Sequence, residues 1–277
     1  MSPFWCAVDR DVVRVGGADA LSYLQSQLSQ DMGSLAIGDA VWSLVLQPTG
    51  KVVALVRVSR IGPNDLLLDV DGGSGGDVVS RLDRFRIRVK VEIEPVPWRG
   101  IAVRSATVPL ADLAPGTWAV PAWWGADVDL LGPSPVAPLA VPAGEPEQLE
   151  SARVQAGWPA MGREITEATI PGELGPVAEL AVSFTKGCYP GQELVERMDS
   201  RGAAAPRLLR RLHSRTDAAV PAEGSVIVAD REVGRVTSAA GPHGLALVGR
   251  GIEPGVEAEV VAVGEPIGVP VEVLPLR

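Results

Sequence analysis

The C-terminal part of the sequence restricts the possible folds most. From Pro206 onward, short runs typical of β-strands alternate with turns rich in glycine and proline. Such runs favour antiparallel pairing, because a tight turn can join two neighbouring antiparallel strands directly. The pattern predicts a small antiparallel β-barrel with strands in residues 225–229, 232–238, 246–249, 257–263 and 269–274.

The preceding part of the chain mixes helical and strand patterns. Asp19 is a suitable N-cap for a helix that carries Leu21, Leu24 and Leu28 on one face. A second helix is expected at residues 78–85 and a third at 146–157. Strands are expected at 12–15, 41–46, 52–58 and 66–70. The sequence therefore predicts an α+β fold ahead of an all-β tail.

Two further segments need separate interpretation. Residues 84–94 alternate strictly between charged and apolar side chains, which predicts a half-buried strand with a solvated outer face. A functional alternative is that the four cations at 84, 86, 88 and 90 steer an anion towards the protein. Residues 95–146 are rich in Pro, Ala and Gly but contain four tryptophans, so we expect an ordered, irregular region.

Composition excludes several classes of function. The net charge of −9 and the pI near 4.9 argue against tight, sequence-independent nucleic-acid binding, which depends on neutralising phosphates. No run of about 18 uncharged apolar residues occurs, and residues 1–10 lack a signal-peptide stretch. We therefore expect a cytoplasmic protein that does not bind membranes.

The two cysteines do not form a recognisable framework. Cys6 and Cys188 lie far apart, which argues against a disulfide scaffold. No CxxC or HxxxH spacing is present, so we expect no metal site built by this chain alone. If Cys188 contacts a metal or an iron–sulfur cluster, another molecule must supply the remaining ligands.

The candidate functional segment is Lys186-Gly187-Cys188-Tyr189-Pro190-Gly191-Gln192-Glu193. Gly187 and Gly191 permit a sharp turn, and an amphipathic helix is expected from Gln192. The helix N-terminus and the Lys186 ammonium would both favour the thiolate form of Cys188, which is the nucleophilic and metal-binding form. The alternative is a packing role, since free cysteines are often buried as small hydrophobes.

This segment resembles the signature K-G-C-[FY]-x-G-Q-E of the YgfZ-type folate-binding proteins, relatives of the glycine cleavage T-protein, an aminomethyltransferase. The resemblance extends over most of the chain. It includes Arg10–Ala20, Tyr23–Gln27 with Asp31, Pro48–Val52, Arg153 with Ala156–Pro159, Gly162–Glu164, Ile170–Glu173, Gly224 and Val233–Ser238.

The resemblance implies a three-domain, cloverleaf-like α+β architecture around a central folate channel. Residues 1–46 and 143–205 would form a discontinuous folate-binding domain that carries the motif. Residues 47–142 would form a ferredoxin-like domain, and residues 206–277 the C-terminal barrel.

The resemblance also implies a cofactor and partners. The cofactor is tetrahydrofolate or another folate, and the partners are iron–sulfur client enzymes or assembly factors, including radical enzymes that modify tRNA. Cys188 and Lys186 are the candidate reactive pair. Candidate folate contacts are Arg10, Arg153, Glu164, Gly187, Tyr189, Gly191, Gln192, Glu193 and Arg197.

One departure from the T-protein pattern bears on activity. The T-protein carries a pair of acidic residues in the stretch that matches Gly50–Leu55, whereas Val53 and Ala54 stand here and the stretch has no acid. Aminomethyl transfer is therefore doubtful, because neither side chain transfers protons or stabilises a cation. The predicted function is a folate-binding accessory protein for iron–sulfur cluster assembly or repair. Two alternatives stay open: a tetrahydrofolate-dependent one-carbon transferase, and a non-catalytic folate-binding module.

Overall fold

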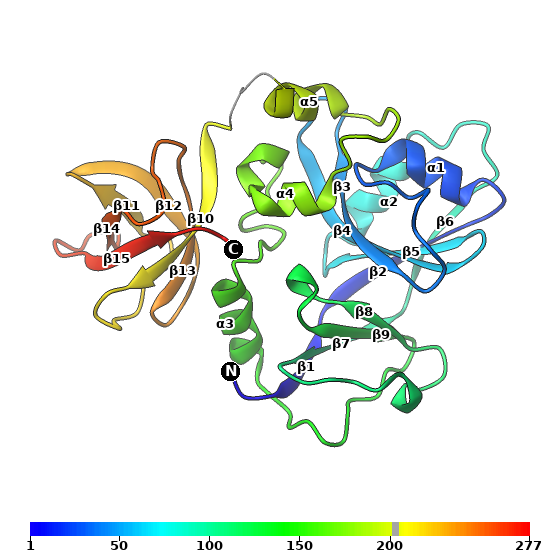
Figure 1. The fold of residues 1–277 in the computed structure, drawn as a ribbon, viewed down its shortest axis with the longest axis horizontal. Coiled ribbons are helices and arrows are strands. Elements are labelled where there is room, and N and C mark those ends of the chain that lie inside the picture. Colours follow the sequence, from blue (N-terminus) through cyan, green and yellow to red (C-terminus); the bar gives the residue numbers. More distant parts are fainter. Residues whose placement is uncertain (201–204) are drawn as a thin grey trace. The chain divides into compact units, whose positions relative to one another are not determined.

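The computed structural model describes residues 1–200 and 205–277, whose helices and strands are drawn in Figure 1. The chain divides into two compact units. Unit 1 comprises Met1–Thr49, Val53–Leu149 and Leu180–Gln192, and unit 2 comprises Gly50–Val52, Glu150–Glu179 and Glu193–Arg277.

Unit 1 contains a five-stranded sheet. Its strand order is β3 (Ala40–Leu46), β4 (Val52–Gly62), β5 (Asp65–Asp71), β2 (Arg10–Gly16) and β6 (Glu92–Val96), in which β4, β5, β2 and β6 pair antiparallel. Helices α1 (Ala20–Gln27) and α2 (Gly75–Asp83) pack against this sheet. The expected helix after Asp19 is confirmed. The Asp19 carboxylate accepts a bond from the Lys90 N–H and makes no capping bond to its own helix.

A second, four-stranded sheet lies in the same unit. Its order is β1 (Phe4–Val8), β7 (Arg99–Arg104), β9 (Val128–Gly132) and β8 (Trp118–Pro121). Short 3-10 turns occur at Leu110–Asp112 and Trp123–Gly125. The expectation of an irregular region at 95–146 is therefore wrong where the chain forms the regular strands β7, β8 and β9. These strands are short, but they bury Ile101, Val103 and Leu130 in a common core.

The expected domain boundary at residues 46 and 47 stays a prediction. Strands from both sides of it share the five-stranded sheet, with β2 and β3 before the boundary and β4, β5 and β6 after it.

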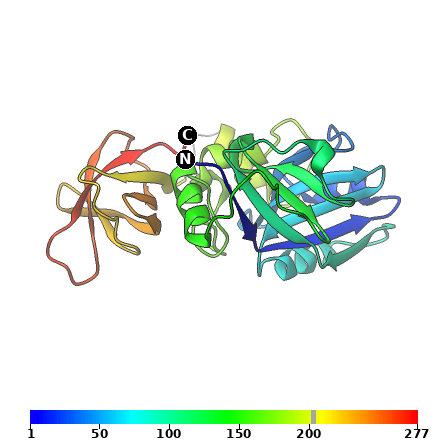
Figure 2. The same ribbon diagram turned by 90° about the horizontal axis from the view of Figure 1, so that it is seen from below.

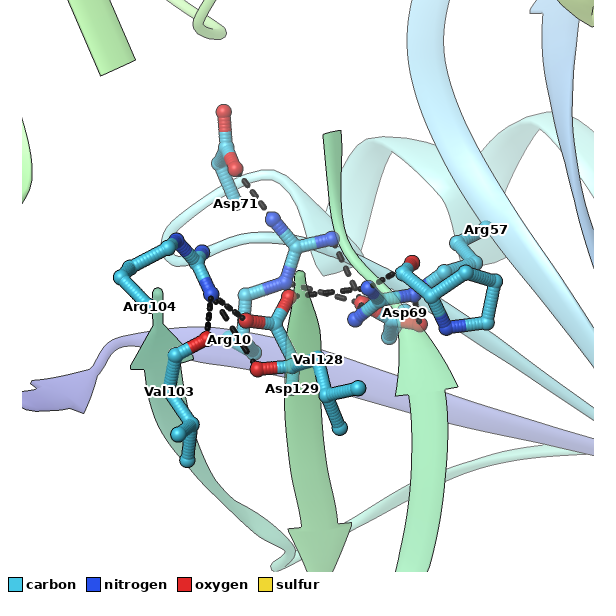
Figure 3. A network of polar contacts seen from close by, with 9 residues as sticks. Arg10, Arg57, Asp69, Asp71, Val103, Arg104, Val128 and Asp129 are labelled. Carbon is cyan, nitrogen blue, oxygen red and sulfur yellow. Dashed lines mark hydrogen bonds and ion pairs between the residues drawn. The ribbon is translucent and has the colours of Figure 1, made fainter. Parts of the chain in front are cut away.

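A network of buried charges connects the two sheets of unit 1 (Figure 3). Arg57 on β4 is fully buried and contacts Asp69 on β5 at 2.8 Å and Asp129 on β9 at 2.8 Å. Arg104 on β7 also contacts Asp129, at 2.8 Å. Buried charges are tolerated when each one is paired, so this network fixes the two sheets against each other.

The strand expected at residues 84–94 is wrong for most of its length. Helix α2 ends at Asp83, and Phe85 and Arg86 donate N–H bonds back to its last turn. Arg88 then takes φ 57°, a left-handed conformation that interrupts a regular strand. Only Glu92–Val96 pairs as a strand, and Ile87 is 69% exposed. Alternation alone was a misleading signal here, because the segment is a turn after a helix.

Unit 2 contains a closed six-stranded barrel (Figures 1 and 2). Its order is β10 (Arg207–Ser214), β13 (His243–Gly249), β12 (Arg231–Ala240), β11 (Ser225–Val228), β14 (Glu257–Val261) and β15 (Val269–Leu274). The predicted barrel is confirmed, although β10 was not expected. Its interior is apolar, with Val226, Val236, Val248, Val260 and Val271 among its buried residues.

The remaining helices are short. They are α3 (Pro146–Ala156), the 3-10 turn Pro171–Leu174, α4 (Pro176–Ala181) and α5 (Gln192–Ser200). The predicted helix at 146–157 and the predicted helix start at Gln192 are confirmed. No helix within the described ranges combines the length and apolar character needed to cross a membrane.

Candidate functional site around Cys188

The Cys188 thiol lies exposed in the turn that precedes α5. Gly191 takes φ 87°, the left-handed conformation that the turn requires; Gly187 is not among the positive-φ glycines of the described chain. The Gln192 side-chain oxygen accepts a bond from the Tyr189 N–H at 3.3 Å, and the Gln192 N–H donates to the Tyr189 carbonyl at 3.3 Å. Gln192 therefore closes the turn, and its assignment as a folate contact stays a prediction.

Lys186 is bound to the end of helix α1. Its ammonium donates to the backbone carbonyls of Gln25 at 2.6 Å, Leu28 at 2.6 Å and Gln30 at 3.0 Å. It also lies 5.2 Å from the centre of the buried Tyr189 ring. A cation is favourable at the C-terminal end of a helix, where carbonyls lack partners within the helix. Lys186 thus joins the motif to a helix far away in sequence.

The segment ahead of Lys186 is held to the same region. Ser183 donates its N–H to the Ser29 carbonyl at 2.9 Å, and the Ser29 hydroxyl donates to the Ala181 carbonyl at 2.7 Å. The Gln30 side-chain amide donates to the Leu180 carbonyl at 2.9 Å. Residues 180–183, which precede the turn with the exposed thiol, are therefore held by hydrogen bonds to Ser29 and Gln30.

The ammonium and the thiol are not joined by a hydrogen bond. All three N–H groups of Lys186 have carbonyl acceptors, so Lys186 can favour the Cys188 thiolate only through its charge. Burial lowers the pKa of Lys186 to about 8, whereas the nearby Asp31 carboxylate and the three carbonyls favour the charged form. This charge therefore declines as the pH rises through that range.

Glu193 and Arg197 lie on the exposed surface of α5. The Glu193 side chain is 91% exposed, and the Arg197 guanidinium is 3.7 Å from its carboxylate. Such a pair adds little stability. Both groups are accessible to a ligand, but nothing in their own contacts indicates one.

Arg153 and Glu164 belong to a buried cluster in unit 2. The Arg153 guanidinium donates to both Glu150 carboxylate oxygens, to the Trp158 carbonyl, to Glu164 and to Ser238, at 2.6–3.0 Å. Glu164, which is fully buried, also accepts bonds from the Ser238 hydroxyl at 2.7 Å and from the Ala160 N–H at 2.9 Å. All five guanidinium N–H groups of Arg153 are used. This cluster joins α3 to strand β12 of the barrel.

Arg10 lies in the charge network of unit 1. Its guanidinium contacts Asp69 at 2.6 Å and pairs with Asp71 (Figure 3). Its side chain is 8% exposed. These contacts account for a structural role, and its assignment as a folate contact stays a prediction.

The structure therefore divides the candidate residues into groups. Lys186, Gly187, Cys188, Tyr189, Gly191 and Gln192 share one turn of unit 1, Arg153 and Glu164 share a cluster of unit 2, and Arg10 belongs to the charge network. The acceptors of Lys186 in the segment Gln25–Gln30 and the hydroxyl of Ser29 were not among the predicted site residues. No spacing rule connects a lysine to carbonyls 156 to 161 positions away.

Within residues 1–200 and 205–277, no group of three or more His, Cys, Asp or Glu side chains is arranged to hold a metal ion.

Comparison with known proteins relates the chain to one group. Residues 207–267 match the family model for the C-terminal β-barrel domain of CAF17. An uncharacterized protein of Haemophilus influenzae is 30% identical over 207 residues, which are 73% of this chain and 71% of that protein. The tRNA-modifying protein YgfZ of Yersinia pseudotuberculosis is 27% identical over 227 residues, covering 70% of this chain and 66% of that protein. The chain belongs to the YgfZ-type family.

A solved structure supports the fold of this YgfZ-type chain. The aminomethyltransferase T of the glycine cleavage system from Bartonella henselae superposes with a TM-score of 0.77 at 16% identity, covering 100% of this chain and 86% of that chain. At this identity the likeness shows the fold alone. The expected α+β, multi-domain architecture with a C-terminal antiparallel barrel is therefore confirmed for the YgfZ-type chain.

Proposed function

We propose that this chain is a folate-binding accessory protein that supports iron–sulfur enzymes, including enzymes that modify tRNA, through the thiol of Cys188. The observation that carries this proposal is the exposure of Cys188 on an anchored turn within the family motif. Relatives that bear the name tRNA-modifying protein YgfZ support the connection to tRNA modification.

The chemistry proposed for Cys188 is coordination. Its thiol would lose a proton to solvent, and the thiolate sulfur would form a transient bond to an iron of a client's cluster. A thiolate is a strong ligand for iron in such clusters. The bond would break when the client's own ligand replaces Cys188. An exposed thiol is required, because the cluster lies in another protein.

Folate binding rests on the family, and the buried candidate contacts do not fit a direct role. Arg10, Arg153 and Glu164 already bond to partners within the chain. Glu193 and Arg197 retain accessible polar groups.

The acidic pair of the T-protein is absent from this chain, which argues against aminomethyl transfer. Strand β4 begins with Val52, Val53 and Ala54, and Val52 and Ala54 are buried. These apolar side chains supply no proton donor or acceptor.

The test compares Cys188→Ser with wild type in cells that lack the endogenous protein. We expect the variant to bind tetrahydrofolate like wild type but to lose the activity of an iron–sulfur, tRNA-modifying enzyme. Cys6→Ser is the matched control, because Cys6 is buried in strand β1. Full activity of Cys188→Ser would contradict the thiol mechanism. Absence of tetrahydrofolate binding to wild type would contradict the folate role.

A second candidate function, a non-catalytic folate-binding module, is favoured by one observation. Lys186 donates its three N–H groups to backbone carbonyls, so this residue of the motif has a structural role. Under this function Cys188→Ser would remain active, whereas a substitution of Lys186 that unfolds the turn would not.

A further inference from the structure

A pocket in unit 2 lies between helix α3 and the outer face of the barrel. Its volume is about 260 Å³, and its lining comprises Val154, Gln155, Arg211, Leu212, His213, His243 and Leu274. His213 and His243 are the chain's two histidines. They are cross-strand partners on β10 and β13, and their rings stack with centroids 4.8 Å apart. The family motif and the Cys188 turn contribute nothing to this pocket.

Polar groups in the pocket lack protein partners. In the described part of the chain, neither histidine ring makes a hydrogen bond, and Nδ1 of His213 is buried without a partner. Arg211 donates through Nε to the Pro275 carbonyl at 2.8 Å and through one terminal nitrogen to the Gln155 carbonyl at 3.0 Å. Its other terminal nitrogen has no bond among the described residues. Buried polar atoms are usually hydrogen-bonded, so Nδ1 of His213, together with the open terminal nitrogen of Arg211, is available to a ligand in this pocket.

The charges around the pocket favour an anion. The lining contains an arginine and two imidazoles but no carboxylate. On the neighbouring strand β15, Glu272 lies opposite His213 in the strand register but does not line the pocket. On β12, the residue opposite His243 is the uncharged Ala240. On α3, Glu150 and Arg153 bond to each other. Burial, and then the charges of His213 and Arg211, lower the pKa of His243, so an anion here would relieve repulsion.

A divalent metal fits less well. The described residues offer no group of three ligands, and the Arg211 charge would repel a cation. The volume also limits the ligand, because pockets for drug-sized molecules span about 300–1,000 Å³. An anionic group fits, whereas a whole folate does not.

We propose that Arg211, His213 and His243 form a binding site for a small oxyanion, a carboxylate or a phosphate group, on the outer face of the barrel. Arg211 provides a fixed charge and free donors, and the two imidazoles provide donors whose protonation increases on binding. Affinity should therefore rise as the pH falls and His243 becomes protonated.

The test follows the two histidine ring signals by NMR while the intact protein is titrated with sodium phosphate or sodium acetate at constant ionic strength. We expect one of these anions to shift both signals saturably and to raise the pKa of His243 by at least about half a unit. The stronger of the two arms identifies the oxyanion. Sodium chloride at the same ionic strength should have no such effect.

Variants connect the response to the pocket. Arg211→Gln should weaken anion binding by about tenfold or more, and Arg250→Gln, an exposed arginine after β13, should leave it unchanged. Because Arg211 also holds α3, His243→Gln serves as a second variant with the same expected loss. Equal responses to chloride, phosphate and acetate in wild type would overturn the proposal. Zinc chloride that shifts both signals when neither oxyanion does would establish a metal site instead and also overturn it.

Discussion

The guanidinium of Arg57 and the carboxylate of Asp69 form a two-point contact inside unit 1, with N–O distances of 3.0 and 2.8 Å. Neither side chain is more than 1% exposed. The same guanidinium reaches across to Asp129 and to the Pro121 carbonyl of the other sheet, both at 2.8 Å. The pair is therefore the central connection between the two sheets.

Removing one partner of this pair should be strongly destabilising. We expect Asp69→Asn to lower the free energy of unfolding by about 3–5 kcal/mol, because it leaves Arg57 buried with less counter-charge. Chemical denaturation measures this loss. Asp65→Asn is the matched control on the same strand, since its pair with Arg14 is half-exposed and worth about 0–1 kcal/mol. Equal losses in the two variants would contradict the structural account.

The lowered pKa of Asp129 should make the free energy of unfolding decrease in acid. Burial alone would raise its pKa, but Arg57 and Arg104 lower it to about 2, from 3.8 in the unfolded chain. A lowered carboxylate pKa stabilises the folded state above the unfolded value, and this contribution disappears as the pH falls towards 2. It should amount to on the order of 2 kcal/mol. Unfolding measured between pH 4 and pH 2 should show a flatter pH dependence in Asp129→Asn than in wild type.

The Lys186 ammonium should titrate near pH 8. The chain contains three lysines, Lys51, Lys90 and Lys186, so their side-chain NMR signals can be assigned by substitution. We expect the signal that titrates near pH 8 to be absent from Lys186→Met and present in Lys90→Met, since Lys90 is exposed. If no lysine titrates below about pH 10, burial does not lower the pKa of Lys186.

Lys186→Met should also loosen the turn that it anchors. Loss of three bonds to carbonyls is expected to cost about 2 kcal/mol and to increase amide exchange at residues 25–30 and 183–189. Hydrogen exchange followed by mass spectrometry measures both segments. Unchanged exchange there would show that the lysine does not hold the turn.

Gly50 should not tolerate a side chain. It has φ 88°, and a Cβ atom there would lie 2.5 Å from the Cβ of Leu194 on α5. We expect Gly50→Ala to cost on the order of 2 kcal/mol or more, from strain and from the clash together. Gly264→Ala is the control, because Gly264 has φ 83° but open space around it, and should cost only the strain. Thermal unfolding of the two variants separates the two contributions.

Local patterns predicted the elements whose character is set by neighbours in sequence. Helix α5 begins at Gln192 as expected, because Gly191 supplies the left-handed turn just before it. The barrel was predictable because its short apolar runs are separated by Gly and Pro turns. The apolar strands β4 and β5 were predictable because both of their faces are buried.

Elsewhere local patterns failed because tertiary contacts decided the outcome. The charged alternation after Phe85 predicted a strand, but N–H bonds to the end of α2 and the left-handed Arg88 produce a turn. Strands β7, β8 and β9 are short, and their pairing with one another and with β1 is not visible in their composition. Strand β10 escaped notice because arginines interrupt its apolar residues.

The candidate site shows the same division. The turn around Cys188 was predictable from two glycines and a following helix. The carbonyls that bind Lys186 and the carboxylates that pair with Arg10 lie far away in sequence, so no spacing could reveal them. Of the two carboxylates that pair with Arg153, only Glu150 lies at a helical i,i+3 spacing.

The charge network of unit 1 limits how its sequence can change over generations. It balances three arginines, Arg10, Arg57 and Arg104, against three aspartates, Asp69, Asp71 and Asp129. Loss of one buried charge leaves its partner buried without a counter-charge, which lowers the stability of the fold. Replacing the whole set by apolar side chains of similar volume can be neutral. Among relatives, these positions should therefore change together or not at all, and a lineage that abandons the arginines should be found to have abandoned the aspartates with them.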